Sequence, residues 1–144
     1  MIIEAIRKYF LGCPVLEKFN NITLLNVNYL SDDTDTYSIE EIPCEPILKR
    51  YADGSTKRQY QFTFCSREPY SAEILQNIEN SGFYEEFADW IEENSDNSIL
   101  PILDGKLEAT SLKVISSAYV VQVTEDTANY QINLKLEYIK RKDW

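Results

Sequence analysis

The residues of this sequence with the chemistry for acid–base catalysis are carboxylates at close spacing. Glu40 and Glu41 are adjacent, as are Glu85 and Glu86, and such a pair can act as general acid and general base. Charged residues at these positions are expected to face solvent, which favours a structural interpretation of both pairs. The chain has no histidine to activate a nucleophile, and its four scattered glycines form no phosphate-binding or dinucleotide-binding motif. We therefore expect neither enzymatic activity nor a bound cofactor.

Three aspartates in a short polar stretch, Asp32, Asp33 and Asp35, resemble the start of a calcium-binding loop. When the loop is aligned from Asp33, Ser38 stands where such loops need glycine and Cys44 stands where they need a bidentate glutamate. The stretch is therefore predicted to be a solvated turn. The three cysteines have no C-x-x-C spacing, so free thiols are expected rather than a zinc site or a disulfide.

Basic residues flank a strand-like aromatic stretch near the middle of the chain. Lys57, Arg58 and Arg67 have two interpretations, which the sequence leaves open. They form a partner contact at the tip of a hairpin, or they form ion pairs with the neighbouring carboxylates of Asp53 and Glu68. The candidate partner or oligomer contacts are Asp53, Lys57, Arg58, Arg67, Asp32, Asp33 and Asp35.

The formal net charge of -10 limits the classes of partner. Nucleic acid and anionic membrane surfaces both attract basic proteins, so binding to either is not expected. The longest apolar run, residues 118–121, is far shorter than the roughly 20 residues of a membrane span. The start of the chain lacks the apolar core of a signal peptide, and we expect an intracellular protein. The acidic surface either maintains solubility or serves to mimic or repel DNA.

The stretch that organises the chain runs from Tyr51 to Trp90. Asp53-Gly54 predicts a hairpin turn, because glycine tolerates the positive φ of tight turns. The following segment alternates between aromatic and polar residues, which predicts a half-buried strand. Apolar residues then recur at helical spacing, in one stripe over residues 74–78 and a second over residues 83–91. The residues predicted to form a shared core are Tyr60, Phe62, Phe64, Phe87, Trp90, Ile132, Leu134 and Leu136.

The remaining elements complete a prediction of one domain over residues 1–144. An amphipathic helix is expected over residues 1–11, and strands over residues 22–30, 36–42, 110–124 and 130–138. The last of these alternates most regularly and should be central. Residues 92–98 read as a polar loop, and residues 99–103 should pack across the fold. The order predicts an α+β fold, in which a mainly antiparallel sheet has the N-terminal helix and the long aromatic helix against one face.

Several phrases in the chain resemble a family of small proteins from tailed phages and prophages of Gram-positive bacteria, usually described as minor capsid proteins. The phrases are IRKYFLGCPVLEKF, YSIEEIPCEPILKRYADGS, the run from RQY through SREPY and NSGFYEE to the aromatic helix, and TANYQINLKLEYIKR. They occur in the same order and cover most of the chain. The predicted element order is also similar to that of phage tail terminators, which is an analogy of fold.

This resemblance implies a structural role at the head–tail junction. It implies a homo-oligomeric ring, usually hexameric, with the tail tube and head-connector proteins as partners. It also implies a location in the host cytoplasm during assembly and in the virion afterwards. In such a ring, the polar stretches Ser31–Asp35 and Glu92–Ser98 are candidates to face the lumen or the tube, and the basic hairpin to reach an acidic neighbour. The alternative function is that of an acidic inhibitor or DNA mimic that binds a host enzyme.

Overall fold

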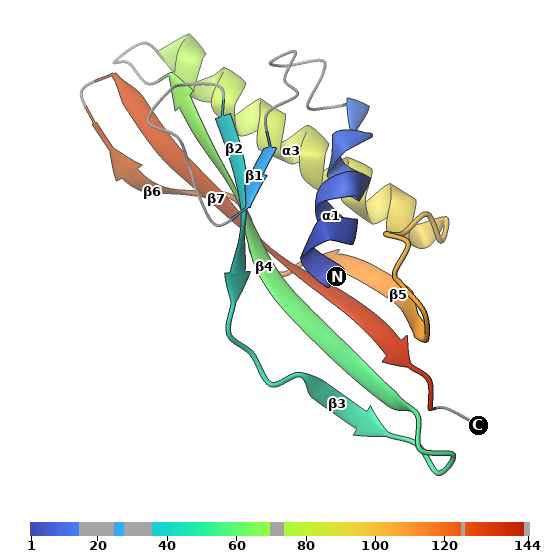
Figure 1. Cartoon of the computed structure of the whole chain (residues 1–144). Coiled ribbons are helices and arrows are strands. Elements are labelled where there is room, and N and C mark those ends of the chain that lie inside the picture. The colour runs from blue at the N-terminus through green and yellow to red at the C-terminus, as the bar shows by residue number, and fades with distance from the viewer. Residues whose placement is uncertain (15–24, 28–35, 70–73, 125, 143–144) are drawn as a thin grey trace.

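The computed structural model describes residues 1–14, 25–27, 36–69, 74–124 and 126–142. These ranges contain two helices and seven strands (Figure 1). In chain order the elements are α1 (Ile2–Leu11), β1 (Leu25–Val27), β2 (Thr36–Ile42), β3 (Ile47–Arg50), β4 (Thr56–Pro69), α3 (Ile74–Asp96), β5 (Leu107–Val114), β6 (Tyr119–Val123) and β7 (Thr127–Lys140). The strand predicted over residues 22–30 is described only at β1.

All seven strands belong to one sheet. Its main path is β1-β2-β4-β7-β5, with β3 paired to β4 and β6 paired to β7. β1 and β2 are parallel, and the other described pairings are antiparallel. β4 and β7 pair along their full length, from Thr56 opposite Lys140 to Pro69 opposite Thr127. The central position predicted for residues 130–138 is therefore confirmed, as is the α+β class with a mainly antiparallel sheet.

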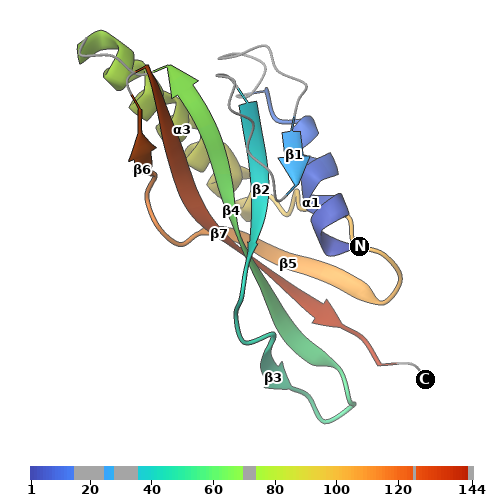
Figure 2. The same cartoon turned by 60° about the vertical axis from the view of Figure 1, so that its left-hand side comes forward.

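Both helices pack on one face of this sheet (Figures 1 and 2). The period-two pattern of β4 and β7 places Phe64 and Ile132 opposite each other on that face, where both are buried. The ring of Phe87 from α3 lies 4.5 Å from that of Phe64, and the ring of Phe10 from α1 lies 5.4 Å from that of Phe87. Aromatic side chains thus join the two helices to the centre of the sheet.

The predicted core is confirmed at six of its eight positions, which are Phe62, Phe64, Phe87, Ile132, Leu134 and Leu136. Tyr60 and Trp90 are only partly buried and pack against the edge of the core. Tyr60 lies farther along β4, toward the hairpin, and its hydroxyl donates to the Glu41 carboxylate at 2.6 Å. The ring of Trp90 lies 5.2 Å from that of Tyr9 and is tilted to it by 45°, at the boundary between the two helices. The side chains of residues 74–78 lie outside the described residues.

The loop predicted over residues 92–98 is wrong, because α3 continues to Asp96. The amide of Asn97 still donates to the carbonyl of Glu93, at 3.1 Å. The helix ends where Ser98 takes a positive φ of 59° and the amide of Ile99 donates back to the Asn94 carbonyl at 2.7 Å. The polar composition of this segment reflects a solvent-exposed last turn of helix, since glutamate is a good helix former.

The predicted hairpin is confirmed and extends beyond the helices (Figure 1). The amide of Tyr51 donates to the Ser55 carbonyl at 2.9 Å, and Gly54 takes a φ of 91° in the turn between β3 and β4. We call residues 47–59, which comprise β3, this turn and the start of β4, the arm. The part of the chain that the structure describes has no helix long and apolar enough to cross a membrane.

Candidate assembly surfaces

The arm carries four of the basic side chains, divided between its two strands. Lys49 and Arg50 are exposed on β3, whereas Lys57 and Arg58 are partly buried on β4. Successive residues of a strand point to opposite faces, so Lys57 and Arg58 do not form one cluster. The Lys57 ammonium lies 3.9 Å from the Glu137 carboxylate, and the Nε of Arg58 donates to the Thr56 hydroxyl at 3.0 Å. The exposed positive charge of the arm therefore lies mainly on β3, and the predicted set of contacts omitted both of these β3 residues.

Asp53 shapes the turn of the arm. Its carboxylate accepts a hydrogen bond from the Ser55 amide at 2.8 Å, and this bond lowers the pKa of Asp53 below its ordinary value. The ion pair of Lys57 is made with Glu137 and not with Asp53, the partner named in one of the two interpretations of the sequence. Asp53 is exposed, and the positive charge of Arg141 also contributes to lowering its pKa.

The structure does not bring the other predicted contacts to the arm. Arg67 lies near the far end of β4, opposite Asn129 on β7. Its sequence neighbour Glu68 is buried. Asp32, Asp33 and Asp35 lie outside the described residues, together with most of the polar stretch Ser31–Asp35.

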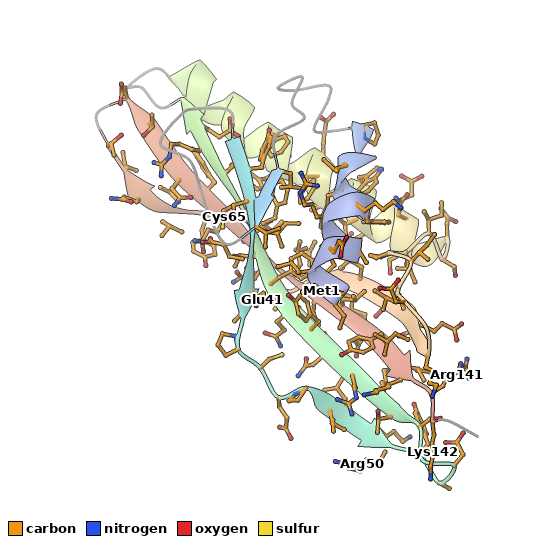
Figure 3. The ribbon with its side chains drawn as sticks, in the orientation of Figure 1. Met1, Glu41, Arg50, Cys65, Arg141 and Lys142 are labelled. Atoms are coloured by element: carbon orange, nitrogen blue, oxygen red, sulfur yellow. The ribbon has the colours of Figure 1, made fainter. Side chains whose placement is uncertain are left out.

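Three consecutive cations missing from the predicted set lie next to the arm, at residues 140–142 (Figure 3). Lys140 pairs with Thr56 at the end of the β4–β7 ladder. The guanidinium of Arg141 forms an ion pair with Glu108, and the amide of Lys142 donates to the Ser55 hydroxyl at 3.4 Å. A register between the hairpin strand and the last strand would have located these cations, but the sequence gives no register. This end of the sheet is thus basic in a chain of net charge -10.

Helix α3 has the opposite charge. It contains neither lysine nor arginine. Its acidic residues with described side chains are Glu85, Glu86, Asp89, Glu92, Glu93 and Asp96, and all but Glu86 are exposed. Within residues 82–96 of α3, every exposed side chain is therefore acidic.

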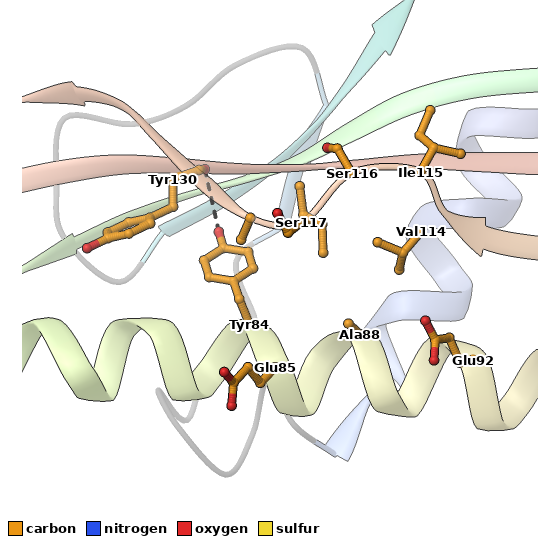
Figure 4. A pocket seen from close by; sticks show the side chains of 11 residues that line it. Tyr84, Glu85, Ala88, Glu92, Val114, Ile115, Ser116, Ser117 and Tyr130 are labelled. Atoms are coloured by element: carbon orange, nitrogen blue, oxygen red, sulfur yellow. Dashed lines mark hydrogen bonds between the residues drawn. The ribbon is translucent and has the colours of Figure 1, made fainter.

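A groove of about 570 Å³ lies between α3 and the sheet (Figure 4). It exists because the strand predicted over residues 110–124 is interrupted. Val114 pairs with Leu134, and Tyr119 pairs with Gln131. The chain therefore advances five residues from β5 to β6 while the paired positions on β7 advance by three. The two extra residues form a bulge over residues 115–118, which redirects the chain locally.

Apolar side chains line much of this groove, and carboxylates stand beside them. Ala88 of α3, Val114 and Ile132 are among the apolar residues. Glu85 and Glu92 lie on either side of Ala88 along α3 and are exposed (Figure 4). The groove therefore offers an apolar surface between two negative charges.

Strand β6 presents a second apolar surface. Within the described residues it pairs only with β7, so it is an edge strand. Its exposed apolar side chains are Tyr119, Val120, Val121 and Val123. Exposed apolar edge strands are favourable sites for adding a strand from another chain.

Of the two carboxylate pairs considered for catalysis, Glu40 and Glu41 each accept a hydrogen bond from another side chain. Adjacent residues of β2 point to opposite faces, so Glu40 accepts from the Cys65 thiol at 2.7 Å while Glu41 accepts from Tyr60. Burial, followed by the hydrogen bond to Glu40, raises the pKa of Cys65 to about 12. This thiol therefore stays protonated at neutral pH. No group of three His, Cys, Asp or Glu residues within the described ranges is arranged to hold a metal ion.

No protein-family model and no curated protein matches this chain.

Proposed function

We propose that this protein is a structural component of a tailed phage that acts at the head–tail junction, as a tail terminator, tail-completion protein or minor capsid protein. Copies of the chain form a ring, a hexamer by analogy with tail terminators, and this ring binds the tail tube and the head-connector proteins. Assembly takes place in the host cytoplasm, and the protein is then part of the virion. The proposed role is assembly rather than catalysis.

The observation that carries this proposal is the separation of charge between the arm and α3. Opposite charges on two separate surfaces favour head-to-tail contacts between copies, and such heterologous contacts close into a ring when the rotation permits. The α+β fold supports the analogy with tail terminators, and the apolar edge at β6 offers a surface for a second partner such as the tail tube. The exposed carboxylates of α3 would also repel DNA that passes through such a ring.

The test is deletion of the gene from the phage or prophage that encodes it. The expected products, seen by electron microscopy, are filled heads and tails that fail to join, or tails of uncontrolled length. Complementation with the intact gene should restore normal particles. Infectious particles of normal form from the deletion would overturn the proposal.

The acidic face of α3 also favours a second candidate, an inhibitor that mimics DNA. Such a protein binds the basic DNA site of a host enzyme and works as a monomer or dimer. It should therefore compete with duplex DNA for that enzyme, and competition should disappear when Glu85, Asp89 and Glu92 are replaced by lysine. Normal competition by this variant would remove the basis for this candidate.

A further inference from the structure

We infer that the groove beside α3 receives strand β3 from a second copy of this chain. The inference rests on the proposed function in one respect, because it gives the surfaces through which the ring would close. The inserted segment consists of the apolar residues of β3 and the turn, together with their neighbouring cations. These cations meet the carboxylates beside the groove.

The first observation is the composition of the outer strand of the arm. Leu48 is 43% exposed and Tyr51 is 37% exposed, although both are large apolar residues. The ammonium of Lys49 lies 5.3 Å from the centre of the Tyr51 ring, in a cation–π arrangement, and Arg50 is exposed beside it. Because side chains alternate along a strand, Lys49 shares one face with Tyr51 and Arg50 shares the other with Leu48, so each face of the arm presents one apolar side chain and one positive charge.

The second observation is that β3 has an available edge. Within the described residues it pairs only with β4, so its other edge has no strand partner. The bulge between Ile47 and Lys49 turns this short strand away from a regular ladder. Exposed edges of this kind are stabilised when another chain covers them.

The third observation is the match between the arm and the groove. The apolar surface around Ala88 and Val114 suits the ring of Tyr51, and a charged rim around an apolar centre is the usual arrangement of a protein interface. Glu85 and Glu92 offer the charges that Lys49 and Arg50 would meet. Both surfaces consist of residues with described side chains.

The fourth observation is the distance between the two surfaces. The helices cover one part of β4, and the turn of the arm lies beyond them at the opposite end of that strand (Figures 1 and 2). The arm and the groove are therefore far apart within one copy and meet only between copies. A contact of this kind is directional, so repetition produces a ring or, with reciprocal insertion, a closed dimer.

The contact can be tested directly by disulfide trapping between copies. In a background in which Cys44→Ser removes the partly exposed thiol, one chain carries Ala52→Cys, at an exposed position next to Tyr51, and the other carries Ser117→Cys in the groove. Mixed at millimolar concentration under mild oxidation, the two chains should form a disulfide-linked dimer at least about tenfold faster than a control pair with Thr124→Cys, which lies outside the groove. A rate equal to that of the control pair would overturn the inference.

Charge exchange tests the same contact by a second measurement. Lys49→Glu/Arg50→Glu and Glu85→Lys/Glu92→Lys should each weaken self-association at least about tenfold, because like charges then face each other. An equal mixture of the two variants restores opposite charges at every contact and should assemble as the unaltered protein does. Glu93→Lys/Asp96→Lys, on the same helix but outside the groove, should leave association unchanged. Failure of the mixture to associate better than either variant would contradict the inference.

The outcomes also separate this inference from the proposed function. A trapped contact together with normal infectious particles from the gene deletion would retain the arm–groove contact and remove the phage role. If the gene deletion gives defective particles but no contact is trapped, the phage role is supported and its interface lies elsewhere on the protein. A trapped contact that sediments as a closed dimer would support the inference and contradict the ring.

Discussion

The carboxylate of Glu137 lies 3.3 Å from the ammonium of Lys113, on the face of the sheet opposite the helices. The hydroxyl of Ser111 donates to the same carboxylate at 2.9 Å, and Lys57 approaches it to 3.9 Å. Burial alone would raise the pKa of Glu137, but the hydrogen bonds and these two positive charges outweigh it and lower the pKa. The ionised carboxylate therefore stabilises the pairing of β4, β5 and β7.

Glu137→Gln should destabilise the protein at neutral pH by on the order of 1 kcal/mol, since the lysines are partly exposed and screened by solvent. A lowered folded-state pKa adds stability above about pH 4.5, the ordinary glutamate value, and this contribution is lost as pH falls through the folded-state pKa. Urea unfolding across acidic pH should show the difference between the two proteins disappearing. A difference that persists unchanged in acid would contradict this role, and Glu108→Gln, at an exposed ion pair, serves as the control.

Leu134→Ala should reduce the free energy of unfolding by about 2–5 kcal/mol, because it leaves a cavity under α3 at a fully buried position of β7. Ile102→Ala, at a side chain that is 90% exposed, should change it by less than about 0.5 kcal/mol. Both changes in the free energy of unfolding are measured by denaturant unfolding, with one common m-value used in the fits. A loss below about 1 kcal/mol at Leu134 would mean that the centre of the sheet is not packed as described.

Gly54→Ala should destabilise the arm by about 1–2 kcal/mol, because a φ of 91° is unfavourable for alanine. The added Cβ would also displace the side chain of Lys142. Gly82→Ala is the matched control, since Gly82 lies within α3 with open space around it and alanine there should stabilise by about 0.5–1 kcal/mol. Effects of the same sign from both substitutions would argue against the positive-φ turn.

The thiols should differ in reactivity. Cys13 and Cys65 are buried, and the raised pKa of Cys65 keeps its sulfur protonated, whereas Cys44 is partly exposed. A thiol reagent in mildly alkaline buffer should therefore label one cysteine per folded chain and all three after unfolding. Cys44→Ser should abolish the labelling of the folded protein. Rapid labelling of that variant would show that the folded protein opens near Cys13 or Cys65.

The regular parts of the fold were predictable because their patterns are local. Alternation of Tyr130 to Tyr138 predicted the central strand, and Asp53-Gly54 predicted the turn of the arm. The extension of α3 through Glu92 and Glu93 was missed, because an exposed helical turn and a loop share a polar composition. The bulge at residues 115–118 was missed as well, since apolar residues on both sides of Ser116 continue the pattern of a strand.

The candidate surfaces were less predictable, because they depend on register and on the bulge. Lys57 and Arg58 were predicted to flank the aromatic strand, whereas both lie within β4, where alternation places them on opposite faces. The cations at residues 140–142 reach the arm through the pairing of β4 with β7. The groove requires α3 and the bulge together, and neither had been predicted in its observed form.

The pairing of β4 with β7 also has a consequence for folding during synthesis. β7 is translated after every other described element, yet it supplies a hydrogen-bonded neighbour along the full length of β4. Until the ribosome has released β7, that edge of β4 stays open, and a contact between such distant segments forms slowly. Nascent chains should therefore expose a β-strand edge and need protection from aggregation until β7 has emerged from the ribosome.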